Sequence, residues 1–347
     1  MYVYLVFDRY HEYSIKSGTR LSRACQHASR RHRLSLTTPL PPQLVALTVT
    51  DNKVQLIDII CQHLTAVTQE TALDHKLVIT GKENTPVEIY KGELRERDDL
   101  RTTHEEADVI MVQQVAKVAN EGTKSIRVIC DDTDVFMLLM YFFQRLQLEC
   151  SLTMESTGSE RTLIDIGACV ESHKGIIPEL LGAHALTGCD TLAQCFGIGK
   201  ATAMKILKSG HSLQSLGEVH VSMEDIMTRA TEFMAACYGS TKRNSMSDVR
   251  VDVWSTKMAR RKVTAAPELK NLPPTTEAFE MNVRRAHIQT AIWKSACEAE
   301  PPKLDPTVYG WKRDDVSKSL EPVRATTHER SCRSSRCLGD DSLWVFV

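Results

Sequence analysis

The stretch ALTGCDTLAQCFGIGKATAMKIL, at 185–207, sets an acid beside a glycine-rich turn. Asp190 precedes the sequence GIGK, which opens a helical pattern. A carboxylate can hold a metal ion, and glycines at a helix N-terminus let backbone amides approach a phosphate. The pairing predicts chemistry on a nucleic-acid backbone. The spacing differs from the Walker pattern, and a short G-x-G alone often marks only a tight corner between helices.

Other acids fall where strands are expected to end. Asp8 follows the apolar run YVYLVF, and Asp132 and Asp134 follow SIRVIC. In a parallel sheet, the side chains that reach a ligand lie at the carboxyl ends of strands. Residues two apart share a face of an extended chain, so Asp132 and Asp134 are expected to point together. Each acid alone also fits an ordinary turn residue.

A third acidic group starts a predicted helix. Glu105, Glu106 and Asp108 follow Thr103, and apolar residues continue the helical spacing. Spacing alone pairs Glu105 with Asp108, and Glu106 joins only if it lies at an irregular helix start. Singly, such acids are ordinary residues of a first helical turn. Clustered carboxylates repel one another and are costly to desolvate, so the whole set predicts a bound cation.

The expected cofactor is magnesium. Mg²⁺ takes oxygen ligands and keeps several of its waters. Two such ions roughly 4 Å apart activate a water and stabilise the leaving oxygen in phosphodiester hydrolysis. We therefore expect two Mg²⁺ ions, with Mn²⁺ as an alternative.

The most basic window of the chain, 13–50, contains no acidic residue. It predicts a segment that faces phosphate, the alternative being a solvated helix face. Because the net charge of the whole chain is −1, attraction for phosphate must come from such local patches. The cations of the window are Lys16, Arg20, Arg23, Arg30, Arg31 and Arg33.

The elements that must position these residues alternate between strand and helix. Strands are predicted at 2–7, 77–80, 87–90 and 125–130, and helices at 53–67, from 103 and from 135. This alternation predicts an α/β protein whose parallel sheet is covered by helices on both faces. The charged stretch 91–101 predicts an exposed connection. A helical C-terminal region is predicted from patterns at 222–238, 247–260 and 276–299.

Composition indicates an intracellular globular protein. The 347 residues are 42% hydrophobic, enough for a core, and no run of 18 apolar residues predicts a membrane span. The start fits a strand better than a signal peptide. Eleven cysteines lie mostly singly within apolar runs, which indicates reduced thiols. Only Cys332 and Cys337 lie close together, in a tail expected to be basic and disordered.

Taken in order, these motifs resemble the flap endonuclease family, structure-specific nucleases with a PIN-like fold. VFDRYHEYSIKSGTRLSR resembles the segment that carries an active-site Asp and then a Lys and an Arg of the helical arch. EEAD resembles the Glu-Ala-Glu box and DDTDV the Asp-x-Asp box. LTGCD with GIGKATAMKIL resembles the Gly-Ser-Asp and helix-hairpin-helix block. The likeness covers residues 2–210 and lies in the order of motifs more than in residue identity.

The resemblance implies roles for particular residues, and it favours Glu106 over Glu105. The implied metal ligands are Asp8, Glu106, Asp108, Asp132, Asp134 and Asp190. Lys16 and Arg23 are implied to contact the scissile phosphate. The implied nucleic-acid-binding residues are Arg20, Arg30, Arg31, Arg33, Gly197, Gly199 and Lys200.

The chain also resembles a divergent animal group, derived from mobile elements, with HEEAD, DDTDV and ALTGCD boxes. In that group a helical C-terminal region ends near a Gly-Trp, as in YGW here. The sequence departs from the flap endonucleases in one respect. Those enzymes have an earlier strand that ends in another metal-binding Asp, and the sequence starts too late to contain that strand. Loss of a ligand weakens metal binding and catalysis. The alternative is therefore a nucleic-acid-binding or interaction module without catalysis.

We expect a nuclear, metal-dependent DNA nuclease of reduced activity that acts on branched or flapped structures. A third hypothesis is a PIN-type nuclease of single-stranded RNA. No membrane partner is expected. The predicted domains are a nuclease domain at 1–215, with a helix-hairpin-helix at 190–210, a helical region at 216–312 and the tail at 313–347.

Overall fold

The structure is a computed structural model, and it forms two compact units of mixed α/β class with small sheets. The first unit comprises Met1–Leu181, Thr290–Leu304 and Arg313–Glu321. The second comprises Gly182–Gln289, Asp305–Lys312 and the residues from Pro322. The described residues are 1–11, 13–18, 20, 30–39, 42–72, 74–241, 244–260, 268–315 and 319–324.

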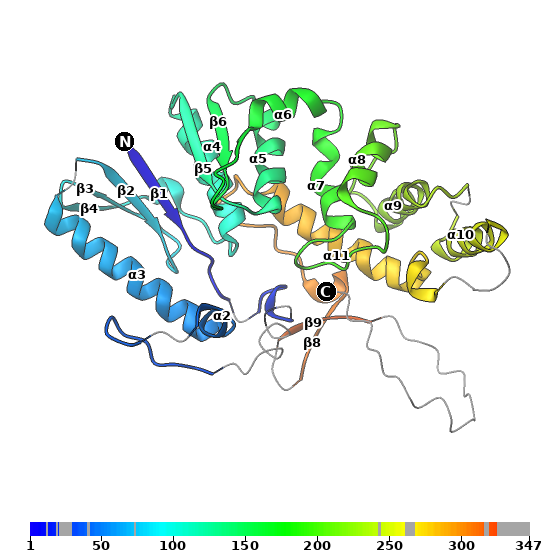
Figure 1. The fold of residues 1–347 in the computed structure, drawn as a ribbon, viewed down its shortest axis with the longest axis horizontal. Coiled ribbons are helices and arrows are strands. Elements are labelled where there is room, and N and C mark those ends of the chain that lie inside the picture. Colours follow the sequence, from blue (N-terminus) through cyan, green and yellow to red (C-terminus); the bar gives the residue numbers. More distant parts are fainter. Residues whose placement is uncertain are drawn as a thin grey trace. The chain divides into compact units, whose positions relative to one another are not determined.

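The first sheet has the strand order β1-β2-β3-β4 (Figure 1). Its strands are β1 (Tyr2–Val6), β2 (Lys76–Thr80), β3 (Val87–Tyr90) and β4 (Glu93–Glu96). β1 is parallel to β2, whereas β3 is antiparallel to both of its neighbours. The first three strands confirm the prediction. β4 lies in the charged stretch 91–101, which is expected to be an exposed connection. Its residues are exposed as expected, but they form a strand that the ELRE sequence does not predict, because it shows no apolar alternation.

A second sheet carries the strand that precedes the DDTD motif. Its strands, in order, are β5 (Ser125–Ile129), β6 (Ser151–Glu155) and β7 (Leu163–Asp165). β5 and β6 are parallel, and β6 and β7 are antiparallel. A further two-stranded sheet joins β8 (Trp311–Arg313) to β9 (Leu320–Pro322). The expected single parallel sheet is therefore not formed: the described strands make separate small sheets, and short turns pair β3, β4 and β7 antiparallel to the strands before them.

Helices α4 and α5 of the first unit pack against each other. Their apolar faces supply fully buried side chains such as Val109, Ile110, Leu138 and Leu139. Burial of each side chain contributes about 1.5–3 kcal/mol, so the two helices hold a fixed relation. The helices of this part are α2 (Gln43–Leu47), α3 (Thr50–Thr71), η1 (Asp98–Leu100), α4 (Ala107–Asn120), α5 (Thr133–Arg145) and α6 (Ile166–His173).

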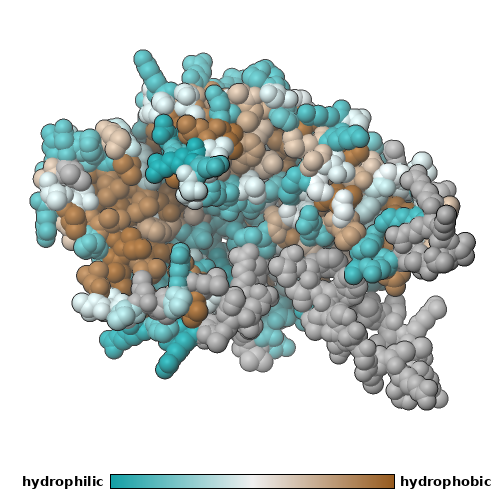
Figure 2. All heavy atoms as spheres, viewed as in Figure 1, coloured by the Kyte–Doolittle hydropathy of each residue, from teal (hydrophilic) through white to brown (hydrophobic). Residues whose placement is uncertain are grey.

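Apolar side chains also reach the surface of the first unit. Figure 2 shows them gathered on the visible face at the side that carries the first sheet and α3. Exposed large apolar residues of these elements include Tyr2, Val3, Val67 and Leu94. Exposed apolar side chains are common on folded proteins.

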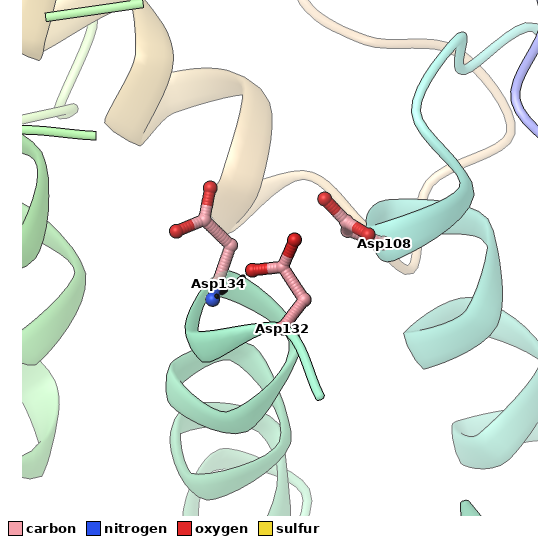
Figure 3. A group of neighbouring side chains, drawn as sticks. All are labelled: Asp108, Asp132 and Asp134. Carbon is pink, nitrogen blue, oxygen red and sulfur yellow. Dashed lines mark hydrogen bonds between the residues drawn. The ribbon is translucent and has the colours of Figure 1, made fainter. Parts of the chain in front are cut away.

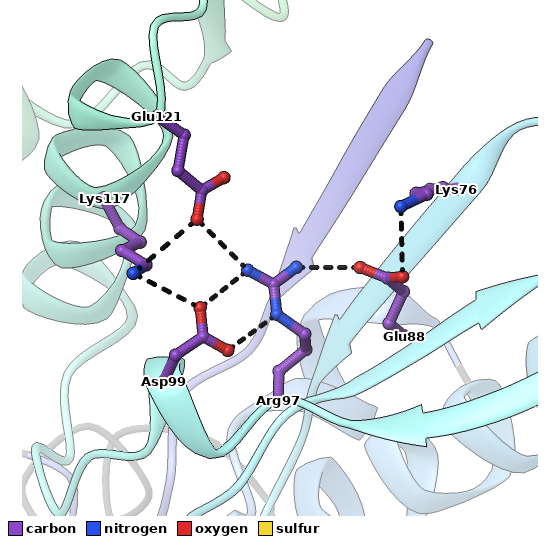
Figure 4. Close-up of polar contacts among 6 residues, drawn as sticks. All are labelled: Lys76, Glu88, Arg97, Asp99, Lys117 and Glu121. Atoms are coloured by element: carbon purple, nitrogen blue, oxygen red, sulfur yellow. Dashed lines mark hydrogen bonds and ion pairs between the residues drawn. The ribbon is translucent and has the colours of Figure 1, made fainter.

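A buried arginine ties the first sheet to the C-terminal end of α4. The Arg97 network consists of Lys76, Glu88, Arg97, Asp99, Lys117 and Glu121 (Figure 4). The Arg97 guanidinium lies 2.8 Å from Glu88 of β3 and 2.8 Å from Asp99 of η1. Lys117 and Glu121, at the end of α4, complete the network at 3.6–3.7 Å. It therefore anchors the helix whose opposite end carries the acidic group.

The remaining helices are α7 (Ile177–Leu186), α8 (Lys200–Lys208), α9 (Met223–Cys237), α10 (Met246–Arg260) and α11 (Thr276–Lys294), with the short η2 (Leu269–Asn271) and η3 (Pro306–Tyr309). Of these, α9, α10 and α11 confirm the helices expected at 222–238, 247–260 and 276–299. α8 begins directly after the glycine turn, as expected. The residues 187–199 before it are not helical, so the first helix expected within 190–210 is not formed. Among the described residues, no helix has the length and hydropathy needed to cross a membrane.

Candidate metal centre

Helices α4 and α5 start with the same acidic pattern. Glu106 is the N-cap of α4 and Asp108 lies two residues further on, whereas Asp132 and Asp134 hold the same places in α5. Both N-cap residues have extended backbone, with φ of −82° and −78°. The extended cap explains how residues two apart gather at a helix start although they diverge within a helix. Helix N-termini also favour carboxylates electrostatically.

Three of these carboxylates lie close together (Figure 3). Asp108, Asp132 and Asp134, called here the acidic triad, each offer an oxygen within 4.8 Å of the other two. Asp134 is buried, Asp108 is half-buried and Asp132 is exposed. The Asp134 amide donates a hydrogen bond of 2.7 Å to Asp132 Oδ1, which fixes the cap. In the described part of the chain, no other cluster of potential metal ligands has this geometry.

The prediction for DDTD was correct in outcome and wrong in reason. Asp132 and Asp134 do follow β5 and do point together. The extended backbone ends at Asp132, however, because Thr133 already begins α5. Their proximity comes from the helix cap rather than from the alternation of an extended strand.

Burial and like charge raise the pKa of Asp108 to about 8, against an ordinary value of 3.8. Desolvation is the largest cause. The ammonium of Lys16 opposes it, while the carboxylates of Asp132, Glu106 and Asp8 add to it. A carboxyl group in this state is mostly protonated at neutral pH unless a cation compensates its charge.

Glu106 is buried beside Lys16. The Lys16 Nζ lies 3.2 Å from Glu106 Oε2, yet this oxygen lacks a well-aligned hydrogen bond. Burial raises the pKa of Glu106, and the neighbouring ammonium of Lys16 opposes that rise. Glu106 does lie at the irregular start of α4, as its N-cap, but it is not one of the three carboxylates of the acidic triad.

Asp8 reaches the same helix start from β1. Its Oδ1 accepts a hydrogen bond of 2.8 Å from the amide of Ala107, the first residue of α4. Asp8 therefore caps the helix that carries Asp108. It also contributes a negative charge to the surroundings of Asp108.

Arg9 holds this strand end in place, and the sequence analysis missed it. The side chain is 1% exposed, and its guanidinium donates to backbone carbonyls 72–95 residues away. The shortest of these bonds, 2.6 and 2.7 Å, go to Thr102 and Glu83. Backbone acceptors carry no sequence signature, so the only available signal was an arginine directly after an apolar strand.

The basic segment contributes two cations to this region. Arg20 Nη2 lies 2.6 Å from Glu105 Oε1, and its guanidinium lies over the Tyr10 ring at 4.8 Å. Glu105 is thus paired with Arg20, while Glu106 is paired with Lys16.

Three other predicted cations of the basic window lie within the described residues. Arg30 and Arg33 are exposed, and Arg31 forms an exposed ion pair of 3.0 Å with Asp51. Arg23 lies outside the described residues.

The predicted residues of the glycine turn lie in the second unit. Asp190 is exposed in the loop that follows α7. Gly197 has φ of +74°, a conformation that favours glycine, and Gly199 is the N-cap of α8. The Lys200 ammonium binds oxygens of His184, Thr187 and Gly188.

The cysteines form free thiols wherever they are described, as expected; they are Cys61, Cys130, Cys150, Cys169, Cys189, Cys195, Cys237 and Cys297. Cys332 and Cys337 lie outside the described residues.

No protein-family model, curated protein or solved structure matches the chain. The geometry of the acidic triad and its neighbours therefore carries the functional argument.

Proposed function

We propose that this chain is a divalent-metal-dependent nuclease of flap endonuclease type, which hydrolyses phosphodiester bonds of DNA. The observation that carries the proposal is the acidic triad at the starts of two packed helices. Three carboxylates within 4.8 Å of one another, one of them with its pKa raised to about 8, form an arrangement that a cation stabilises.

The donor set fits a hard cation. All three groups of the triad are carboxylates, which suit Mg²⁺ or Mn²⁺ better than a thiolate-binding metal. Asp108, Asp132 and Asp134 would hold the ion, with Glu106 and Asp8 beside them. When bound, such an ion activates a water and stabilises the leaving oxygen of a phosphodiester.

The chain's own residues prepare this site in two ways. The amide donors of Ala107 and Asp134 fix Asp8 and Asp132, so the carboxylates are held before any ligand arrives. Lys16 and Arg20 place positive charge beside Glu106 and Glu105, where it would offset the charge of an incoming phosphate.

The glycine turn supports a DNA substrate. Gly197 and Gly199 leave backbone amides at the start of α8, where a phosphate of the duplex would bind. We further propose a PIN-like nuclease fold, branched or flapped DNA as substrate and the nucleus as location. These finer statements rest on the motif order described above.

Cleavage assays test the proposal. Full-length protein is incubated with labelled flap DNA, hairpin DNA and single-stranded RNA, each with MgCl₂ and with EDTA. We expect Mg²⁺-dependent cleavage of DNA that falls by on the order of a hundredfold in Asp132→Ala. Asp131→Asn is the matched control, because Asp131 accepts bonds from Thr157 and lies outside the triad.

Three results would separate the hypotheses. DNA cleavage that persists unchanged in Asp132→Ala contradicts the proposal. Preferential cleavage of the RNA supports the PIN-type RNA nuclease instead. Salt-dependent DNA binding without cleavage under any metal condition supports a nucleic-acid-binding module that has lost catalysis.

A further inference from the structure

The side chain of Lys200 points back to the end of the preceding helix. Its ammonium donates hydrogen bonds of 2.6 Å to the carbonyls of His184 and Gly188 and of 3.1 Å to Thr187 Oγ1. These acceptors lie 12–16 residues earlier, at the C-terminal end of α7 and just beyond it. Lys200 is the first residue of α8, so one side chain joins the end of one helix to the start of the next.

Each of the three ammonium protons has an acceptor in this arrangement. The acceptors include carbonyls at a helix C-terminus, where a positive charge is favourable. Thr187 and His184 are buried, at 1% and 3% exposure, so water replaces the lysine poorly. The Thr187 hydroxyl itself donates 2.7 Å to the carbonyl of Ala183, which orients its oxygen toward Lys200.

The loop between the end of α7 and the start of α8 is compact. Gly188 has φ of +111°, and a Cβ there would lie 2.8 Å from the Cα of Gln194. Cys189 and Leu192 form an antiparallel bridge within the loop. Asp190 lies exposed at the turn between those two residues. We call residues 187–199 the Asp190 loop.

We propose that Lys200 is a positioning residue that holds the Asp190 loop and the glycine turn in one arrangement, rather than a cation that binds phosphate. Its functional consequence rests on the proposed function, in which the glycine turn holds a phosphate of the DNA. Phosphate contact at this turn is then left to the backbone amides of Gly197 and Gly199 and to Lys205, which is exposed on α8.

Three variants of the full chain test the structural part. Lys200→Met keeps the aliphatic stem and removes the charge, Lys200→Arg keeps the charge, and Lys205→Met is the matched control on the same helix. We expect amide hydrogen exchange in 187–195 to become at least about tenfold faster in Lys200→Met. Lys205→Met should leave that exchange unchanged, and Lys200→Arg should restore part of the protection. Thr187→Val, a milder removal of one acceptor, should give a smaller acceleration.

Two functional readouts distinguish positioning from phosphate binding. Loss of one phosphate contact lowers the slope of log affinity against log salt by about 0.9. We expect Lys200→Met to leave this slope unchanged on a labelled flap DNA. It should lower the affinity for that DNA by the same factor at every salt concentration, because a loosened glycine turn holds the phosphate less well.

Unchanged hydrogen exchange in Lys200→Met overturns the inference, whatever the DNA result. A salt slope that falls by about 0.9 in Lys200→Met also overturns it, because it assigns the ammonium to a phosphate. Absence of any DNA binding or cleavage in the parent protein contradicts the proposed function instead, and the exchange experiment still decides the role of Lys200.

Discussion

The carboxyl group of Asp108 shows how unfavourable negative charge is at the candidate site when no cation is bound. Its pKa is raised to about 8 chiefly by burial, with Asp132, Glu106 and Asp8 as neighbouring negative charges. An acid whose pKa is higher in the folded state destabilises that state as pH rises. The penalty is absent below pH 4, grows between pH 4 and 8 and is complete above pH 8. A bound cation removes it.

The first prediction at this scale follows from the loss of stability that ionisation of Asp108 causes as pH rises. In metal-free buffer, Asp108→Asn should be more stable than the parent at pH 8, by on the order of a few kcal/mol, since each unit of pKa shift corresponds to about 1.4 kcal/mol. The difference should vanish near pH 4. MgCl₂ should stabilise the parent at pH 8 and leave Asp108→Asn unchanged. Denaturant unfolding at both pH values, with and without the metal, measures all of these effects.

The control for Asp108→Asn is Glu171→Gln, a surface carboxylate whose side chain is 72% exposed. Its free energy of unfolding should stay within about 0.5 kcal/mol of the parent at either pH. A metal-free Asp108→Asn protein that is less stable than the parent at pH 8 would show that the Asp108 charge is already compensated.

At the scale of elements, α4 connects the candidate site to the first sheet. Its start carries Asp108, and its end meets the Arg97 network. Arg97 and Glu88 have side chains only 10% and 9% exposed, so removing the arginine leaves a largely buried carboxylate without its closest partner. We expect Arg97→Met to lower the free energy of unfolding by about 3 kcal/mol, with part of the loss recovered in Arg97→Lys.

The same network gives this prediction a pH dependence. Hydrogen bonding to Arg97 is the main cause that holds the pKa of Asp99 at about 2, below its ordinary 3.8. The stabilisation is therefore present above pH 4 and is lost as pH falls through 2. Arg95→Met, an exposed change on the neighbouring strand β4, is the matched control and should cost at most about 0.5 kcal/mol. Equal losses in both variants, measured by urea unfolding, would argue against the network.

The apolar pattern of the sequence was sufficient to predict the strands and the helix that carry the acidic residues. It was insufficient to predict the short strands and the buried arginines that support them. The apolar runs before Asp8 and Asp132 predicted β1 and β5, and helical spacing predicted α4. β7 has only three residues, too few to establish alternation. Arg9 and Arg97 bind partners chosen by tertiary structure, so no spacing rule identifies them. Likewise, the caps that bring Glu106 and Asp132 to the site depend on where each helix begins, the least predictable feature of a helix.

At the scale of the whole molecule, the first unit is discontinuous in sequence. Residues Thr290–Leu304 belong to it together with Met1–Leu181. The amide of Thr103 donates 2.8 Å to the carbonyl of Ala299, and the Thr102 hydroxyl donates 3.1 Å to the same oxygen. The buried His104 ring lies 3.2 Å from the carbonyl of Ser295. The late segment, Thr290–Leu304, thus supplies hydrogen-bond acceptors to the residues directly before Glu106 and α4.

This arrangement makes the predicted domain boundary at 215 testable. A fragment of residues 1–215 lacks Ser295 and Ala299, so the Thr103 amide and the hydroxyl of the buried Thr102 lose their acceptor and the buried His104 ring loses its partner. We expect the fragment alone to unfold without a cooperative transition and to show no stabilisation by MgCl₂. Co-expression with residues 216–324 should restore both, because the missing contacts are then available in trans. Within the intact chain, Thr102→Val should cost about 1–3 kcal/mol, since at nearly constant volume it removes the bond to Ala299 and the acceptor of the buried His104 amide. If the isolated fragment unfolds cooperatively and gains the full Mg²⁺ stabilisation of the intact protein, the late segment is dispensable and the nuclease unit ends where the sequence motifs end.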